Sequence, residues 1–151
     1  KEVKKDPQIK NTGANDAFVY LEVAVPMADV ETAAEDGTRL DPKNQELFSF
    51  QASSSWTKLS SRKAGEDQIY VYAYNQILKP EQTTDALFNS VKFINLIEGQ
   101  LDEQKLNIPI RAYAIQTSYT GGDSGSVTDQ AKAAYEKYVN QNKDKEGGVT
   151  P

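Results

Sequence analysis

The sequence predicts a mainly β protein, an antiparallel β-sandwich with one helix at its C-terminal end. Roughly six to eight short segments alternate apolar and polar residues at a period of two, and turn residues separate them. After residue 127 the apolar spacing changes to that of a helix. The length of 151 residues suits one domain with a real core. We therefore expect a sandwich domain over 1–142, including a helix at 128–142, and a flexible tail or linker at 143–151.

The first two predicted strands are residues 2–10 and 17–25, with a turn cluster at 11–16 between them. Pro7 cannot donate a ladder hydrogen bond, so the first strand is expected at a sheet edge. The second strand is the clearest in the chain, and Pro26 is expected to end it. One face of that strand carries Val19, Leu21, Val23 and Val25, and the other carries Phe18, Tyr20 and Glu22.

The middle of the chain predicts a long surface loop at 28–44 and shorter strands at 46–51 and 55–60. Residues 68–75 then alternate strictly. On this strand Ile69, Val71 and Ala73 point one way, and Tyr70, Tyr72 and Tyr74 point the other. We expect the three tyrosines to share a face with Phe18 and Tyr20 of a neighbouring strand.

The C-terminal part predicts strands at 87–93 and 106–116, a loop rich in Gly and Ser, and then the helix. Thr128 is expected to cap the helix, and Asp129 favours its N-terminal dipole. The residues at helical spacing that are expected to pack it are Ala131, Ala134, Tyr135 and Tyr138.

Composition argues against the common catalytic mechanisms. The chain has no Cys, and therefore no disulfide, thiol nucleophile or thiolate metal ligand, and it has no His, the commonest general base and zinc ligand. Glu22 with Glu98 or Asp102 is the only plausible acid–base pair, and no nucleophile with its base and orienting group stands out. We expect a protein that is not an enzyme and that has no cofactor and no metal.

Charge and hydropathy constrain the partners. The net charge is −5, and the N-terminal lysines Lys1, Lys4 and Lys5 are interleaved with acidic residues, so no nucleic-acid partner is expected. No apolar run approaches the roughly 20 residues of a membrane helix, so this segment is not expected to span a membrane. The acidic loops at 29–41 and 123–129 lack the residue order of a helix–loop–helix calcium site, and solvated charge is the favoured interpretation. A Cys-free exported chain is ordinary for a bacterium with a single membrane, which suggests an extracellular location.

Several segments together carry a family resemblance. In chain order they are Lys10-Asn-Thr-Gly13, Asn15-Asp-Ala-Phe-Val-Tyr-Leu-Glu-Val23, Tyr70-Val-Tyr-Ala-Tyr74, Ile77-Leu-Lys-Pro-Glu-Gln-Thr-Thr84, Leu87-Phe-Asn-Ser-Val91 and Ile108-Pro-Ile-Arg-Ala-Tyr-Ala-Ile-Gln116. Over residues 5–142 the chain resembles the TasA/camelysin family of Gram-positive exported surface and biofilm-matrix proteins. The resemblance implies a jelly-roll-like sandwich and assembly into extracellular fibres by exchange of strands between subunits.

The chain departs from the family in two respects. Family members usually carry further strand-forming residues before the position of Lys1. The camelysin branch has been described as a metalloprotease, but this sequence has no His-Glu-x-x-His helix, so that activity is not carried over.

Two groups of residues are the candidate sites. The strand-exchange candidate is the row Val3, Lys5, Pro7 and Ile9, since a strand at the chain terminus either pairs with its own sheet or completes that of a neighbour. The aromatic binding-face candidate is Tyr70, Tyr72 and Tyr74, and the competing interpretation is that tyrosine is simply a good strand residue that covers a sheet face.

The expected function is that of a non-enzymatic structural protein of the cell surface or biofilm matrix. The expected partners are other copies of the chain or other surface and matrix proteins. The alternative is a monomeric surface adhesion module that binds a glycan or a protein.

Overall fold

The computed structural model describes residues 2–31, 36–41, 43–94, 108–117 and 126–148, with the backbone alone for 2–4 and 140–148. The elements in this part of the chain are β1 (Glu2–Lys4), β2 (Ala17–Val30), β3 (Lys43–Glu46), β4 (Phe48–Phe50), β5 (Trp56–Ala64), β6 (Asp67–Tyr74), β7 (Ser90–Phe93), β8 (Ile110–Gln116) and α1 (Val127–Gly148). All their strand pairs are antiparallel. The predicted fold class, a mainly β sandwich-like fold with a C-terminal helix, is confirmed.

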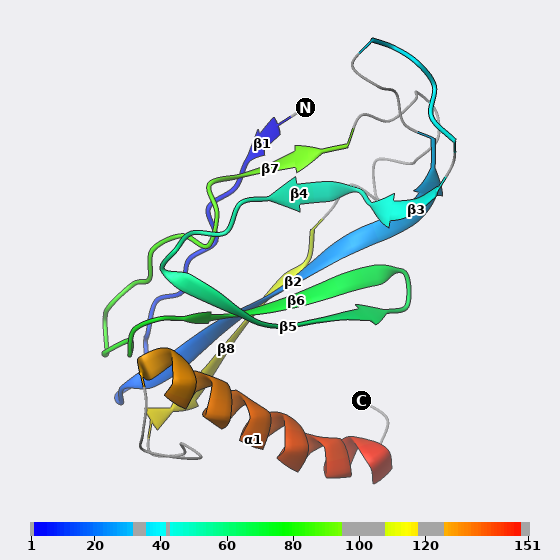
Figure 1. Cartoon of the computed structure of the whole chain (residues 1–151). Helices are drawn as coiled ribbons and strands as arrows, with labels where there is room; N and C mark the ends of the chain where they lie inside the picture. Colours follow the sequence, from blue (N-terminus) through cyan, green and yellow to red (C-terminus); the bar gives the residue numbers. More distant parts are fainter. Residues whose placement is uncertain (1, 32–35, 42, 95–107, 118–125, 149–151) are drawn as a thin grey trace.

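The strands form two sheets, which are shown in Figure 1. The larger sheet has the order β3-β2-β6-β5, and β8 also pairs with β2; the smaller sheet has the order β1-β7-β4. Apolar residues of both sheets meet in one buried cluster, to which β2 contributes Val19, Leu21, Val23 and Val25 and the smaller sheet contributes Phe48 and Val91. This cluster lies between the two sheets and is the main core.

The strand β2 runs four residues beyond Pro26, so the prediction that Pro26 ends it is wrong. Ala24 N donates to Pro109 O (3.0 Å) and Leu47 N donates to Pro26 O (2.9 Å), both on the edge of β2 away from β6. The N–H and C=O groups of alternate residues point to the same edge of a strand, so the nitrogen of Pro26 faces away from β6. Its missing N–H therefore removes no hydrogen bond between β2 and β6. The strand then continues because Val30, which is buried, pairs with Lys43.

The predicted loop at 28–44 is correspondingly wrong at both ends, where β2 and β3 pair with each other. The predicted strand at 46–51 is interrupted at Leu47, whose side chain is fully buried. Residues 32–35 and 42 of that loop, and residues 106–107 of the last predicted strand, lie outside the described residues.

The register between β2 and β6 corrects the predicted grouping of aromatic residues. Leu21 lies opposite Tyr72, and Tyr20 lies opposite Ala73. Directly opposite residues share a face of the sheet, so Tyr72 belongs to the main core, whereas Tyr20 points to the other side. Tyr20 and Phe18 form a second buried cluster with Ala73 and with the helix residues Ala131 and Ala134.

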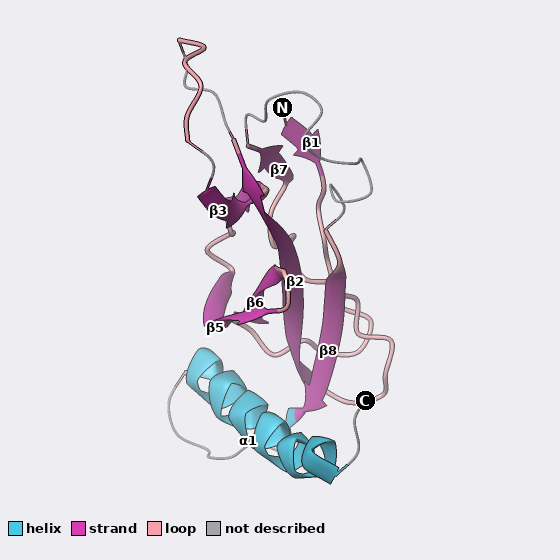
Figure 2. Cartoon of the chain, turned by 90° about the vertical axis from the view of Figure 1, so that its right-hand side faces the viewer, coloured by secondary structure: helices cyan, strands magenta, loops and turns pink. Residues whose placement is uncertain are grey.

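The helix α1 covers this second face of the larger sheet, as Figure 2 shows. Its predicted packing residues Ala131 and Ala134 are buried, Tyr135 is half-buried, and Tyr138 is exposed although its ring lies 6.4 Å from that of Tyr113. The Tyr20 hydroxyl donates a hydrogen bond to the Ala131 carbonyl (2.7 Å). Burial raises the pKa of the Tyr20 hydroxyl, so it remains a donor well above neutral pH.

The ends of α1 differ from the prediction. Ser126, not Thr128, caps the helix: Asp129 N donates to Ser126 Oγ (3.1 Å), and Ser126 N donates to Asp129 Oδ2 (3.3 Å), the reciprocal arrangement of a capping box. Thr128 instead donates to Asn75 Oδ1 (2.9 Å). The helix runs to Gly148, so part of the predicted tail is helical, and residues 149–151 lie outside the described residues. In the described part of the chain, no helix is both long and apolar enough to cross a membrane.

The Tyr20 bond to α1 predicts the effect of Tyr20→Phe. We expect a loss of about 1 kcal/mol in the free energy of unfolding, because the buried Ala131 carbonyl loses a donor while the ring stays in place. Urea denaturation measures this loss, and hydrogen exchange should show weaker protection of the amides near Ala131. Unchanged stability and protection would mean that this bond does not hold the helix.

Candidate functional site

The N-terminal segment, residues 2–11, lies antiparallel to residues 81–92 over its whole length. The strand β1 pairs with β7, with Val3 opposite Val91. Of the strand predicted at 2–10, only β1 is strand, but beyond it individual backbone bonds still join the two segments: Lys5 N to Asn89 O (3.0 Å), Leu87 N to Pro7 O (3.0 Å), Thr84 N to Ile9 O (2.9 Å), Asn11 N to Gln82 O (2.9 Å) and Glu81 N to Asn11 O (2.7 Å). Figure 1 shows this segment running beside β7. Pro7 takes part only as an acceptor, as its missing N–H requires.

Side chains alternate along this segment as the sequence predicts. Lys5, Pro7 and Ile9 are half-buried, and the intervening residues Asp6 and Gln8 are exposed. Ile9 packs against the main core. Three of the four predicted strand-exchange residues therefore form one inward row, and the side chain of the fourth, Val3, lies outside the described residues.

Thr84 forms hydrogen bonds with Gln8 and Ile9 of the segment. The Thr84 side chain is 2% exposed, and its Oγ1 accepts a hydrogen bond from Ile9 N (3.0 Å). Gln8 Nε2 donates to Thr84 O (2.9 Å). The sequence analysis did not single out Thr84 as a contact of this segment, because its partners lie more than 70 residues away in the chain.

Asn11 fixes the end of the segment. Its side chain is 9% exposed, and its Nδ2 donates to the carbonyl oxygens of Leu78 and Asn15 (both 2.9 Å). Gly13 N donates to Asn11 Oδ1 (2.9 Å), which closes an Asx turn. The Asn-Thr-Gly order was the available signal, but it predicts the turn and not the bond to Leu78.

The tyrosine row does not form an exposed binding face. Tyr72 and Tyr74 are 9% and 6% exposed and belong to the main core. Tyr70 is half-buried: its hydroxyl donates to Glu46 Oε1, and Lys58 Nζ lies 5.4 Å from the centre of its ring. The competing interpretation, that these rings cover the inner face of the sheet, describes their positions.

Glu22 is a largely buried carboxylate on the sheet face under α1. Its side chain is 12% exposed, Tyr113 Oη donates to its Oε2 (2.6 Å), and Arg62 Nη2 lies 3.5 Å from its Oε1. Burial, followed by the bond to Glu22, raises the pKa of Tyr113. The possible catalytic partners Glu98 and Asp102 lie outside the described residues. In the described part of the chain, Glu22 links strands β2, β5 and β8 through its contacts with Arg62 and Tyr113.

The described residues contain no group of three His, Cys, Asp or Glu side chains that could hold a metal ion. The acidic loops at 29–41 and 123–129 lie partly outside the described ranges. Comparisons of the chain with protein-family models, with curated proteins and with solved structures give no match. The resemblance to the TasA/camelysin family therefore stays a prediction, and the geometry carries the functional argument.

The Thr84 contact predicts the effect of Thr84→Val. The two side chains have nearly the same shape, so the main change is that Ile9 N–H loses its acceptor. We expect a loss of about 1–3 kcal/mol in the free energy of unfolding, the usual cost of a buried unsatisfied donor. Hydrogen exchange at Ile9 should accelerate. Thr83→Val, at the exposed neighbouring position, is the matched control and should change neither quantity.

The buried tyrosines predict alkaline instability. Burial, together with the Glu46 carboxylate, raises the pKa of Tyr70 to about 12 from an ordinary value of 10.0, and burial raises the pKa of Tyr72 as well. The unfolded chain therefore releases these protons first, and stability should fall as the pH rises from about 10 towards 12. Urea denaturation at several pH values measures this decline. Tyr70→Phe should make the decline shallower, and an identical slope in that variant would contradict the assignment.

Proposed function

We propose that this chain is a non-enzymatic structural protein of the extracellular surface or matrix, and that it assembles by strand complementation. The observation that supports the proposal most is the ladder of the N-terminal segment. The segment pairs with residues 81–92 through backbone bonds, it inserts Ile9 towards the main core, and it joins β2 through the exposed residues 12–16. An element held in this way is one that a neighbouring copy can supply with the same contacts.

The energetics suit a concentration-dependent exchange. Each ladder bond contributes about 1 kcal/mol net, and burial of Ile9 adds roughly 1–2 kcal/mol. These contacts are the same within one chain and between two chains, so the balance depends on the local protein concentration. The closed form is favoured in dilute solution because the segment's own chain offers an effective concentration in the millimolar range. A crowded surface or matrix favours the exchanged form.

Asn11 sets the boundary of the exchanged strand. Its side chain is tied both to Leu78 and to Asn15, which leads into β2. Moving Asn11 would leave a buried amide without its partners, at a cost of roughly 1–3 kcal/mol. We therefore assign residues 2–10 as the exchanged strand and Asn11 as its pivot.

A pair of cysteines tests the proposal, because the natural chain has none. Lys4 and Ser90 lie directly opposite each other in the ladder of β1 and β7, within the separation that a disulfide spans. The variant Lys4→Cys/Ser90→Cys, oxidised in dilute solution, should give a monomer on non-reducing gels. Oxidised at millimolar concentration, it should give a ladder of covalent multimers that reductant collapses.

The matched control is Lys63→Cys/Gln68→Cys. These residues also lie directly opposite each other, but in the hairpin of β5 and β6, where Gly65 forms the turn. This tight turn provides no hinge from which one strand could separate and pair with another copy. This variant should remain monomeric at both concentrations. Monomers alone from the Lys4/Ser90 pair at millimolar concentration, together with an absence of fibres in electron micrographs, would contradict the proposed function.

The alternative, a monomeric module that binds glycan or protein through Tyr70, Tyr72 and Tyr74, is not proposed. Two of these side chains are in the core, so they offer no surface to such a ligand.

A further inference from the structure

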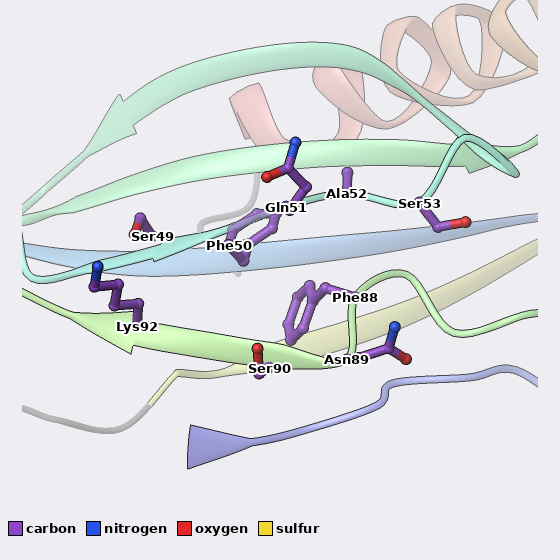
Figure 3. A pocket seen from close by; sticks show the side chains of 9 residues that line it. All are labelled: Ser49, Phe50, Gln51, Ala52, Ser53, Phe88, Asn89, Ser90 and Lys92. Carbon is purple, nitrogen blue, oxygen red and sulfur yellow. The ribbon is translucent and has the colours of Figure 1, made fainter. Parts of the chain in front are cut away.

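A groove opens between β4 and β7 of the smaller sheet, beyond the point where their ladder ends. Their ladder ends at the pair Phe50 and Val91, and the next bond between the two chain segments is Ser53 N to Leu87 O (2.7 Å). Between these two points the strands are apart and leave a space of about 640 Å³. Figure 3 shows the side chains that line it. This volume falls within the range of about 300–1,000 Å³ that is usual for small-ligand sites.

Two phenylalanines form the floor of the groove. The ring centres of Phe50 and Phe88 lie 4.7 Å apart, and Figure 3 shows the two rings facing each other at the middle of the space. Phe88 is 1% exposed, whereas Phe50 is half-buried. The Phe50 ring contacts those of Tyr70 and Tyr72 edge-on, with ring centres 6.2 and 6.0 Å apart. The floor is therefore apolar and held in place by the main core.

Polar side chains form the rim. Ser49 and Gln51 alternate with the inward residues of their strand, and Ser49 lies opposite Lys92. Ser49, Gln51, Asn89 and Lys92 are all exposed. The rim therefore offers a hydroxyl group, two amides and an ammonium group above an aromatic floor.

The groove carries a positive charge on a protein that is acidic overall. The chain has a net charge of −5, yet the described residues that line the groove include one cation and no carboxylate. A multiply charged anion such as a nucleotide would need more cations. A ligand with one carboxylate and several hydroxyl groups matches a site with one ammonium group and several hydrogen-bonding side chains.

We propose that this groove binds a uronic-acid residue of an acidic polysaccharide. The apolar C–H face of a pyranose ring would lie over Phe50, its hydroxyl groups would bond to Gln51 and Asn89, and its carboxylate would pair with Lys92. The proposed ligand contacts involve neither the inward row of the N-terminal segment nor Thr84, but Asn89 and Lys92 also pair through their backbone with that segment.

The test is a titration of the whole isotope-labelled chain with tri-galacturonic acid, followed by NMR, with the methyl-esterified trimer as comparison. The acid should shift the amide signals of Gln51, Asn89 and Lys92 along a saturable curve. The ester should bind more weakly, by roughly threefold to fivefold, the factor that an exposed ion pair provides. Added salt should reduce this difference.

Two charge variants make the test sharper. Lys92→Gln should weaken binding of the acid by the same factor and leave binding of the ester unchanged. Lys43→Gln, an exposed substitution on β3, is the control and should change nothing.

Several results would overturn the proposal. One is the absence of saturable shifts at the groove with either trimer. Another is equal binding of the acid and the ester, which would remove the role of Lys92. A third is binding of the acid that Lys92→Gln and Lys43→Gln weaken alike, which would indicate attraction to lysine in general.

Discussion

The strand β2 is the element on which the rest of the structure depends. It pairs with β3, β6 and β8, and its two faces serve two different cores. Odd-numbered residues such as Leu21 and Val23 fill the main core, whereas Phe18 and Tyr20 hold the helix. Strict alternation in one long strand therefore builds both layers at once, and a shift of its register by one residue would exchange the two faces.

The N-terminal segment stands outside this network. It pairs through its backbone with residues 81–92, and it is connected to β2 by residues 12–16, by the bond of Asn11 to Asn15 and by the packing of Ile9 against the main core. None of the strand pairs of β2 involves residues 2–10. The segment can therefore have its own, lower, opening free energy within a stable domain. That separation is the physical requirement for exchange without unfolding.

Local pattern was sufficient for part of this structure. Alternation predicted β2, β6 and the inward row of the N-terminal segment, and helical spacing predicted Ala131 and Ala134 as packing residues. Local pattern was insufficient wherever a contact with a residue far away in the sequence determines the structure. The Pro26 carbonyl accepts its hydrogen bond from Leu47, and the burial of Tyr72 follows from its position opposite Leu21. Thr84 and Asn11, which hold the candidate strand, meet residues far away in the chain, and no local period encodes those contacts.

The strand β7 and the residues before it bring the two proposed activities into contact. Asn89 gives its carbonyl oxygen to Lys5 of the N-terminal segment and lines the groove as well. Lys92 pairs with β1 on one side and with β4 on the other. A ligand that holds this strand in one position therefore acts on the same backbone that receives the exchanged strand. If bound saccharide changes the free energy of exchange, linkage requires exchange to change saccharide affinity by the same factor. A matrix polysaccharide would then be a component that regulates assembly, and not only a surface to which the assembled protein adheres.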